Sequence, residues 1–363
     1  MIAVTLKKIL IVAPSLDVKT NVSGMSAVAS FIVANNRACQ YEHFLQGKSD
    51  GEKGPHNRVL RVLKNYGTWK QKLKSMDDST VIHFNFSTDT PGILRDYFFL
   101  RKAYQQGKKM IVHLHGGLYL FQEKKPFVIR WMLSGIFRMD VPFIALSEKE
   151  KRQLENKYGV KQVVVLPNCV DLSEAAADTT KNYTGRLDLL YMGRIEPDKG
   201  MDYLYEAMAA WKETADDLCL HFAGIEQGGG GYVEKFRQLL GGRFVYEGVV
   251  SGHRKTELLR QCQVFLLPSF YEGLPMSLLE CMSFGQVPVV TDVGSICEYV
   301  TDRVNGLVVK VKDADSITEA VKLLLHDRLL LEKMSGAARQ TVFERLRPED
   351  YISKLNHLYA SLG

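Results

Sequence analysis

Short apolar runs alternate along the chain with longer stretches in which an apolar residue returns every three or four positions. The short runs are typical of buried β-strands, and the longer stretches are typical of helices with one apolar face. Strands are predicted at residues 10–13, 81–84, 110–115, 143–146 and 163–166, and then at 187–191, 218–223, 244–248, 264–267, 287–290 and 306–309. Because strands and helices alternate in this order, the pattern predicts an α/β protein with parallel sheets that carry helices on both faces.

The polar stretch 172–186 has no strong period and interrupts this alternation. With 363 residues, 46% of them hydrophobic, the chain is long enough for two domains that each bury a core. We therefore predict two doubly wound, Rossmann-like domains, at residues 1–170 and 171–345, facing a cleft that is the default binding site. A last helix from Pro348 has one apolar side, which must be buried against another part of the protein.

Charge is distributed unevenly between the two halves. Residues 1–170 hold 26 Lys and Arg against 13 Asp and Glu, a net +13, and the remainder holds 21 against 28, a net −7, which together give the formal +6. A basic half suits an anionic membrane surface or a charged substrate. Nucleic acid is a poorer candidate, because the basic residues form no dense run with interleaved aromatic residues and no nucleic-acid-binding motif is present.

The sequence shows no signal for export or for crossing a membrane. Arg130, Arg138 and Asp140 interrupt the best apolar stretch, so no run reaches the ~20 apolar residues of a membrane helix. The amino-terminal stretch lacks a basic start and a small-residue cleavage site. The six cysteines are scattered without a CxxC pair, which favours a reduced protein with neither zinc site nor disulfides. We predict a cytoplasmic protein.

Residues 127–138, FVIRWMLSGIFR, form an unusually apolar helical pattern. In a helix, Arg130, Ser134 and Arg138 fall on one narrow stripe and apolar residues cover the rest. One interpretation is a buried helix. The other is an interfacial helix whose basic residues meet anionic headgroups, so that the protein attaches peripherally to the inner face of the membrane.

Two turns in the first half follow predicted strands and contain glycine. Gly24 lies in the loop between the first strand and the first helix, where backbone approaches a phosphate in many α/β proteins, although a plain turn gives the same pattern. His113 and His115 point to one face of another strand, but no third ligand follows at metal spacing. His115 directly precedes Gly116 at the carboxyl end of that strand, which favours contact with a substrate.

The second half contains two cations and two carboxylates in loops of the same kind. Arg194 and Lys199 lie in the glycine-bounded turn GRIEPDKG, where they could converge on one anion or be solvated. Glu272 and Glu280 lie on either side of a predicted helix start in FYEGLPMSLLECMSFG. A helix start suits an anionic ligand, and the two carboxylates could hold hydroxyls beside it or could be surface residues.

Four blocks, at residues 193–200, 246–252, 266–290 and 305–309, in this order and spacing, resemble the retaining nucleotide-sugar glycosyltransferases with the GT-B fold (glycosyl transferases group 1). The resemblance covers nearly all of the second half closely and the first half in outline. The two glutamates separated by seven residues look like that family's pair. The resemblance implies an acceptor-binding first domain, a donor-binding second domain, and a final helix that crosses back to the first domain.

The resemblance also implies roles for single residues at the reacting end of the donor. Arg194 and Lys199 would neutralise the donor diphosphate and stabilise it as the leaving group. Glu272 would bind the hydroxyls of the donor sugar as a catalytic-site residue. The backbone close to sugar and phosphate would come from Gly273, Leu274 and Pro275.

The remaining implied contacts lie on both domains. Glu280 would hold the ribose hydroxyls, and the backbone near Val249 would read the base. Gly24 would approach donor phosphate and acceptor, and His115 would contact the sugar near the reacting carbon. Family members often carry two adjacent glycines where this chain has Ser23 and Gly24, which leaves that contact open.

We therefore expect a metal-independent, retaining glycosyltransferase without a cofactor. It would move a hexose-type sugar from a UDP- or GDP-sugar to a cell-surface glycan, as in lipopolysaccharide or capsule biosynthesis, or to a lipid-linked saccharide. One alternative is a sugar-nucleotide epimerase of the same architecture. The other is a non-catalytic nucleotide-binding protein, which would have less reason to keep both cations and both glutamates.

Overall fold

A computed structural model describes residues 6–17, 21, 23–47, 55–116, 118–122, 124–177, 181–211 and 217–362. The chain divides into two compact units. Unit 1 contains Met1–Asn168 and Glu349–Gly363, and unit 2 contains Cys169–Pro348. The first boundary therefore falls after residue 168, where the sequence had suggested residue 170, and the polar stretch 172–186 belongs to unit 2.

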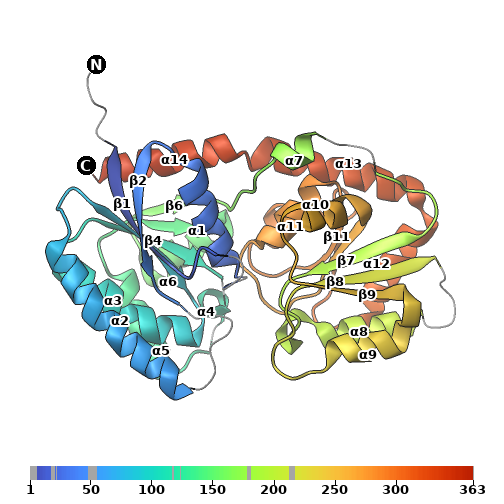
Figure 1. Cartoon of the computed structure of the whole chain (residues 1–363), viewed down its shortest axis with the longest axis horizontal. Helices are drawn as coiled ribbons and strands as arrows, with labels where there is room; N and C mark the ends of the chain where they lie inside the picture. The colour runs from blue at the N-terminus through green and yellow to red at the C-terminus, as the bar shows by residue number, and fades with distance from the viewer. Residues whose placement is uncertain are drawn as a thin grey trace. The chain divides into compact units, whose positions relative to one another are not determined.

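Unit 1 is built on a parallel sheet with the strand order β2-β1-β3-β4-β5-β6 (Figure 1). The strands are β1 (Lys7–Ala13), β2 (Cys39–Leu45), β3 (Val81–Ser87), β4 (Met110–His115), β5 (Phe143–Ala145) and β6 (Val163–Val165). Strand β2 was missed by the sequence analysis. It is an edge strand with no fully buried residue, so it lacks the continuous apolar run of a central strand.

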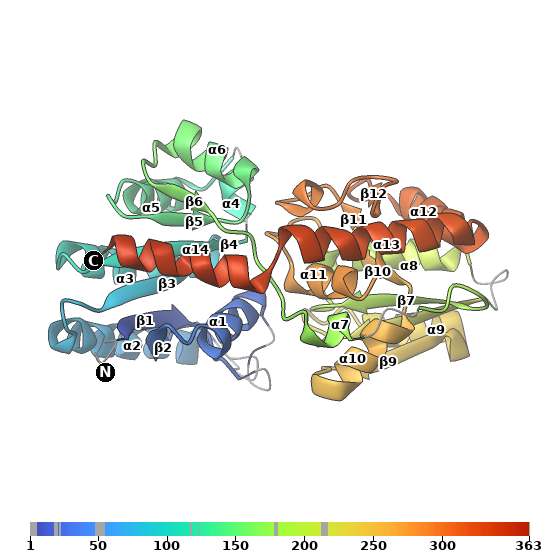
Figure 2. The same cartoon turned by 90° about the horizontal axis from the view of Figure 1, so that it is seen from above.

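Helices cover both faces of this sheet. They are α1 (Gly24–Asn35), α2 (Pro55–Ser75), α3 (Thr90–Gln105), α4 (Leu118–Phe121), α5 (Phe127–Phe137), α6 (Glu148–Tyr158) and α14 (Pro348–Ser361). Helices α2, α3 and α5 lie on one face, and α1 and α14 lie on the other (Figures 1 and 2). On the first face the buried ring of Trp69 packs edge-on against Phe84, at 6.3 Å between centroids.

The opposite face of the sheet is more polar, because His83, Asn85, His113 and His115 all point to it. Helix α14 closes this face. The hydroxyl of Tyr359 lies 2.6 Å from His83 Nδ1, and Tyr351, Leu355 and Leu358 are buried beside it. The prediction that the final helix crosses back to the first domain is confirmed.

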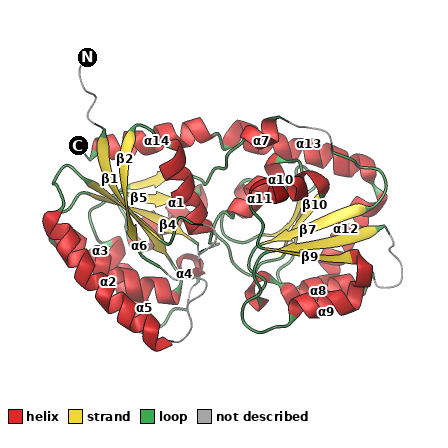
Figure 3. Ribbon diagram, viewed as in Figure 1, coloured by secondary structure: helices red, strands yellow, loops and turns green. Residues whose placement is uncertain are grey.

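Unit 2 repeats the design with the strand order β12-β11-β10-β7-β8-β9, again all parallel. Its strands are β7 (Leu187–Met192), β8 (Leu218–Ala223), β9 (Phe244–Gly248), β10 (Val264–Leu267), β11 (Val287–Thr291) and β12 (Leu307–Val309). All six match predicted strands to within a few residues. Figure 3 shows this second sheet enclosed between helices.

The helices of unit 2 are α7 (Ser173–Ala176), α8 (Met201–Ala209), α9 (Tyr232–Leu240), α10 (Gly252–Gln261), α11 (Met276–Ser283), α12 (Ala314–His326) and α13 (Arg328–Arg345). Helices α8, α9 and α12 lie on one face of the sheet, and α10, α11 and α13 lie on the other (Figure 1). Within the described ranges, no helix has the length and apolar character needed to span a bilayer.

The strand order places a topological switch point in each sheet, between β1 and β3 in unit 1 and between β10 and β7 in unit 2. In unit 2 the chain runs outward through β7, β8 and β9, then returns to β10 beside β7 and runs outward the other way. The loops that follow β7 and β10 therefore leave the same edge of the sheet side by side. In open α/β sheets, this is where ligands bind.

Candidate functional site

The loops after β7 and β10 are joined by an ion pair. Lys199 Nζ lies 2.7 Å from Glu272 Oε1, and the side chains are only 11% and 13% exposed. The hydroxyl of Ser269 donates to the same oxygen at 2.7 Å. Among the described residues, both bonds use Oε1 and leave Glu272 Oε2 available to accept a hydrogen bond from a ligand hydroxyl.

Glycine makes the close approach of these loops possible. Gly200 has a φ of +78°, and a Cβ there would lie 2.1 Å from the carbonyl oxygen of Pro268. Gly294 has a φ of +58°, and a Cβ there would lie 2.2 Å from the carbonyl oxygen of Glu272. Any side chain at either position would push the backbone of the Glu272 loop away.

Further contacts fix the loop around Glu272. The N–H of Phe270 donates to the carbonyl of Asp198 at 3.0 Å, and the hydroxyl of Tyr271 donates to the Asp198 carboxylate at 2.9 Å. Lys199 Nζ also lies 5.6 Å from the centre of the Tyr271 ring. Side-chain and backbone contacts therefore hold the two loops against each other.

Arg194 points differently from Lys199. Its Nη1 lies 3.5 Å from Glu196 Oε1, and its side chain is 43% exposed. Within the described part of the chain, no recorded contact joins Arg194 to Lys199 or Glu272. Lys199 pairs with Glu272, and the convergence of both cations on one anion stays a prediction.

Glu280 lies on α11, after the helix start predicted at Pro275. Pro275 is the N-cap of this helix. Lys255 from α10 donates to Glu280 Oε1 at 2.7 Å, and both side chains remain partly exposed. Between the two glutamates, Leu274 is buried and Ser295 donates its N–H to the carbonyl of Gly273 at 3.0 Å. This segment is thus rigidly supported on both sides.

Val249 lies just beyond the carboxyl end of β9. Its side chain is 51% exposed, in a loop that begins with Gly248 at a φ of +66°. The N–H of Gly224 donates to the carbonyl of Gly248 at 2.7 Å, which holds the start of the loop against the end of β8. An exposed apolar residue at this sheet edge can contact a planar ligand group.

His115 is buried at the end of β4 in unit 1. Asn85 Nδ2 donates to the carbonyl of Val12 at 3.0 Å, so Asn85 Oδ1 faces His115 Nε2 at 2.8 Å and accepts a hydrogen bond from its N–H. Burial lowers the pKa of His115 to about 3, with a further lowering from His83. The ring is therefore neutral at pH 7 and keeps Nδ1 as a hydrogen-bond acceptor.

His113 is a packed residue in this structure. Its Nδ1 lies 3.1 Å from His83 Nε2, and its ring lies 4.2 Å from that of His115, between centroids. Gly116, the next residue after His115, has a φ of +79° and accepts a hydrogen bond from Thr88.

Gly24 is the first residue of α1. The hydroxyl of Ser23 caps this helix by accepting a hydrogen bond from Ser26 N at 3.3 Å. A Cβ on Gly24 would have no heavy atom within 4 Å, so no described neighbour requires glycine there. Residues 18–20 and 22 of the same loop, and residue 117 after Gly116, lie outside the described residues.

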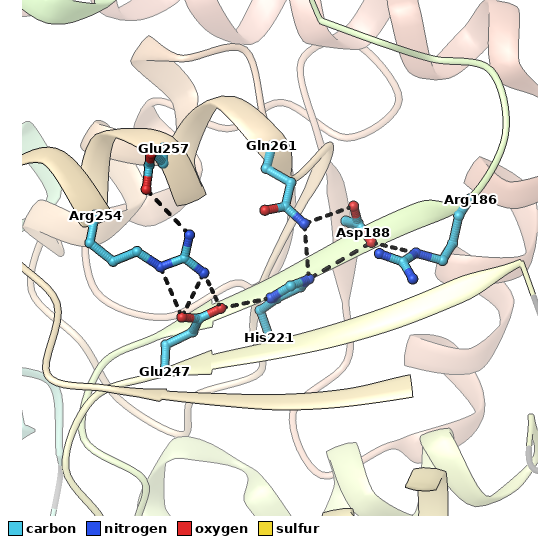
Figure 4. Close-up of polar contacts among 7 residues, drawn as sticks. All are labelled: Arg186, Asp188, His221, Glu247, Arg254, Glu257 and Gln261. Atoms are coloured by element: carbon cyan, nitrogen blue, oxygen red, sulfur yellow. Dashed lines mark hydrogen bonds and ion pairs between the residues drawn. The ribbon is translucent and has the colours of Figure 1, made fainter. Parts of the chain in front are cut away.

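One polar network in unit 2 was missed by the sequence analysis (Figure 4). His221 on β8 lies between Asp188 on β7 and Glu247 on β9, under helix α10. Strand residues of this kind look like ordinary core positions in the sequence. Only the pairing of three strands brings them together, so no sequence motif points to them.

Ligand atoms of Asp188, Cys219 and His221 lie within 4.8 Å of one another, and in the described ranges this is the group whose spacing would allow a metal ion. However, the Asp188 carboxylate already accepts hydrogen bonds from Arg186 at 2.9 Å and from Gln261 at 3.2 Å. Burial alone would lower the pKa of His221, but bonds and charges from Asp188, Cys219 and Glu247 raise it to about 10. Asp188, His221 and Glu247 therefore form an ion network with the arginines beside them.

The geometry thus defines a class: two Rossmann-like α/β units, with a cation and a carboxylate facing each other at the switch point of the second. Comparison with known proteins agrees. Residues 173–341 match the family model of glycosyl transferases group 1, and residues 40–174 match that of glycosyltransferase family 4. The chain belongs to the glycosyl transferases group 1 family, which has the GT-B fold.

Curated relatives are similar at moderate identity. The chain is 30% identical over 177 residues to an uncharacterized glycosyltransferase of Methanocaldococcus jannaschii, covering 47% of this chain and 44% of the relative. It is 25% identical over 305 residues to N,N'-diacetylbacillosaminyl-diphospho-undecaprenol alpha-1,3-N-acetylgalactosaminyltransferase of Campylobacter jejuni, covering 78% and 77%. The match thus spans less than half the length of the first relative.

Solved structures show the same fold over the whole chain. Sucrose-phosphate synthase from Thermosynechococcus elongatus superposes with a TM-score of 0.77 at 17% identity, covering 98% of this chain and 99% of that one. HepE from Anabaena in complex with UDP superposes with a TM-score of 0.72 at 15% identity, covering 98% and 100%. The predicted fold class is confirmed.

Proposed function

We propose that the protein is a retaining glycosyltransferase that moves a sugar from a nucleotide-diphosphate donor to a saccharide or lipid-linked acceptor. The observation that carries this proposal is the contact between Lys199 and Glu272 at the switch point of unit 2. A buried lysine suits a diphosphate, and a carboxylate with one free oxygen suits sugar hydroxyls. The named donor in a related fold is UDP-glucose, bound to HepE.

In the proposed reaction, the bond between the anomeric carbon and the diphosphate oxygen breaks and the acceptor oxygen bonds to the same face of that carbon. Lys199 and Arg194 stabilise the negative charge on the departing diphosphate, which is the largest electrostatic contribution such a site can make. The acceptor proton passes to an oxygen of the departing phosphate. Because two cations supply the positive charge, the proposed step needs no divalent metal.

In this proposal, Glu272 and His115 each bind a hydroxyl of the donor sugar. Glu272 accepts hydroxyl hydrogen bonds through Oε2, while Lys199 and Ser269 hold Oε1 in place. Glu280 binds the ribose, and Val249 lies against the base. The neutral ring of His115 accepts a hydrogen bond from a sugar hydroxyl through Nδ1, and does not act as an acid.

A lipid-linked acceptor is supported by the Campylobacter relative, whose name specifies a diphospho-undecaprenol substrate. An anionic membrane surface is supported by unit 1. Three aromatic side chains on α3 and α5 are half or more exposed: Phe98 (51%), Trp131 (52%) and Phe127 (71%). We propose that this aromatic surface rests on the inner face of the membrane, which would make the protein cytoplasmic and peripheral.

The buried ring of Tyr97 lies against two of these aromatic side chains, and a cation lies over the third. The Tyr97 ring lies 5.3 Å from that of Phe98 and 5.2 Å from that of Trp131, between centroids. Arg130 lies over the Phe127 ring, at 5.7 Å from its centre. Helix α5 has one face buried in the core and the other exposed, and the exposed face supports this proposal.

Incubation of the purified protein with UDP-, GDP- and ADP-sugars and a membrane extract tests the proposal. We expect the nucleoside diphosphate to be released only when the acceptor is present. With a donor that carries a labelled sugar, we expect the label to be incorporated into the extract. Conversion of the sugar nucleotide to another sugar nucleotide in the absence of acceptor would indicate the epimerase. Binding of nucleotide with neither transfer nor hydrolysis would indicate the non-catalytic protein.

A further inference from the structure

The ion network around His221 lies on the face of the unit 2 sheet that α10 covers (Figure 4). His221 is 3% exposed, and its neighbours come from every adjoining element. Asp188 comes from β7 and Glu247 from β9, while α10 contributes Arg254 and Gln261. The other titratable or charged groups nearby are Lys181, Arg186, Cys219, Glu257 and Cys262.

The contacts form an unbroken sequence of alternating charge. Arg186 Nε lies 2.9 Å from Asp188 Oδ1, and that oxygen lies 3.8 Å from His221 Nε2. His221 Nδ1 lies 3.1 Å from Glu247 Oε1, and Arg254 Nη2 lies 2.8 Å from the same oxygen. A neutral imidazole has one N–H, but both ring nitrogens here face carboxylates. Gln261 Nε2 also lies 3.5 Å from His221 Nε2, but with a carboxylate near each ring nitrogen and a pKa raised to about 10, the ring is positively charged at pH 7.

This arrangement fixes both ends of one loop. Glu247 stands directly before Gly248 and Val249, and Arg254 lies in the first turn of the helix that follows. Arg254 donates two hydrogen bonds to the Glu247 carboxylate, from Nε at 3.1 Å and from Nη2 at 2.8 Å. The ion pair therefore holds the two ends of the segment 248–253 together. The contact between Glu247 and His221 attaches this segment to the sheet.

The same helix also contacts the candidate site directly. Lys255, next to Arg254, donates to Glu280 at 2.7 Å. At the other end of α10, Lys181 Nζ donates to the carbonyls of Leu259 and Cys262, at 2.9 Å and 2.5 Å. A shift of α10 relative to the sheet would therefore move Val249 and Glu280 together.

We propose that His221 and Glu247, through Arg254, are positioning residues that hold loop 248–253 in the conformation that binds the nucleotide base. This proposal rests on the proposed function, because the loop is assigned to the donor there. Burial alone would raise the pKa of Glu247, but Arg254 and, to a smaller extent, the cation at His221 lower it. The contact with His221 orients the carboxylate that fixes Arg254 at the start of α10. Loss of the cation releases the loop without touching the groups around the diphosphate.

Two variants test this. His221→Asn removes the charged ring, and Arg254→Gln releases the loop at a partly exposed position where folding is not at risk. We expect each to raise the dissociation constant of the nucleoside diphosphate that the wild type binds, among UDP, GDP and ADP, by about tenfold, which is about 1.4 kcal/mol. The rate at saturating donor should stay within about twofold, because Lys199 and Glu272 are untouched.

Arg237→Gln is the matched control. Arg237 forms an exposed ion pair with Glu234 on α9, at 2.7 Å, in the same unit but outside the network. The dissociation constant should not change in this variant. A lowered melting temperature in His221→Asn or Arg254→Gln with unchanged nucleotide affinity would show a merely structural network and overturn the proposal.

The charge on His221 is measured separately by ¹⁵N NMR of histidine-labelled protein at pH 8, where the two ring nitrogens of an imidazolium have similar shifts. A neutral ring, or one bound zinc or cobalt ion per chain, would also overturn the proposal. If the wild type binds none of the three nucleotides, the donor assignment itself fails and the loop has no base to position. The imidazolium signal would then report the ion network alone.

Discussion

Lys199 and Glu272 are 73 positions apart in the sequence, yet Lys199 Nζ lies 2.7 Å from Glu272 Oε1. The neighbouring positions of β7 and β10 in the sheet account for this contact, because each residue lies in the loop that follows one of these strands. Both side chains are largely shielded from water, so the pair interacts more strongly than a surface ion pair would.

Replacement of Lys199 tests the role of this pair in turnover. We expect Lys199→Ala to lower the turnover rate at saturating donor by about 100-fold or more, because the departing diphosphate loses its nearest buried cation. The measurement is nucleoside diphosphate release in the presence of acceptor. Lys235→Ala on α9, where Nζ lies 5.1 Å from the centre of the Tyr232 ring, is the control. A nearly unchanged rate for Lys199→Ala would contradict the assigned role.

Replacement of Gly200 tests whether the loop contact is sterically required. Gly200→Ala should destabilise the protein by more than the about 1–2 kcal/mol that a positive φ alone costs, because its Cβ would collide with the Pro268 carbonyl. Gly185→Ala is the matched control, since Gly185 has a φ of +82° and open space around its Cβ position. Urea unfolding measures both free energies. Equal losses in the two variants would show that the collision is relieved by a shift.

The buried histidines of unit 1 predict acid sensitivity. Burial lowers the pKa values of His83 and His115 to about 3, whereas the unfolded chain titrates them near 6.5. The unfolded state therefore binds more protons between pH 6.5 and 3, and the free energy of unfolding falls as the pH drops through that window. Above about pH 7 these two groups contribute no pH dependence.

Urea unfolding followed by tryptophan fluorescence at pH 7.5, 6.0 and 5.0 measures this effect. Each histidine contributes up to about 1.4 kcal/mol per pH unit below its unfolded pKa. His115→Asn should reduce the slope by about one such contribution, whereas His326→Asn, at an exposed position on α12, should leave it unchanged. A free energy that is flat from pH 7.5 to 5.0 would contradict the buried, neutral state.

The aromatic surface of α3 and α5 predicts binding to anionic lipid. Phe127→Ser and Trp131→Ser should each reduce flotation with vesicles that contain anionic lipid. Each substitution removes an aromatic side chain that is more than half exposed on the helix that carries Arg130. Leu329→Ser is the matched control, since Leu329 is 80% exposed but lies on α13 in unit 2. Flotation independent of anionic lipid at low salt, or equal loss in the control, would refute membrane attachment through this surface.

Much of the architecture followed from the sequence, because buried parallel strands are continuous apolar runs and the helices between them are amphipathic. Strand β2 was the exception, since an edge strand alternates and carries charged residues such as Glu42. The helix from Pro348 was recognisable by its apolar side. The surface that this helix covers, the polar face around His83, could not be predicted from the local sequence pattern. The contact joins His83 to Tyr359, which are 276 positions apart.

For the candidate site, sequence and tertiary structure contributed different things. The residue types and their order, above all GRIEPDKG and the two glutamates of FYEGLPMSLLECMSFG, determined the family and which side chains could meet a nucleotide sugar. Only the tertiary structure paired Lys199 with Glu272, turned Arg194 toward Glu196, and enclosed His221 between two carboxylates. Those contacts depend on which strands lie side by side, and strand order is set by packing over the whole sheet and not by any local stretch.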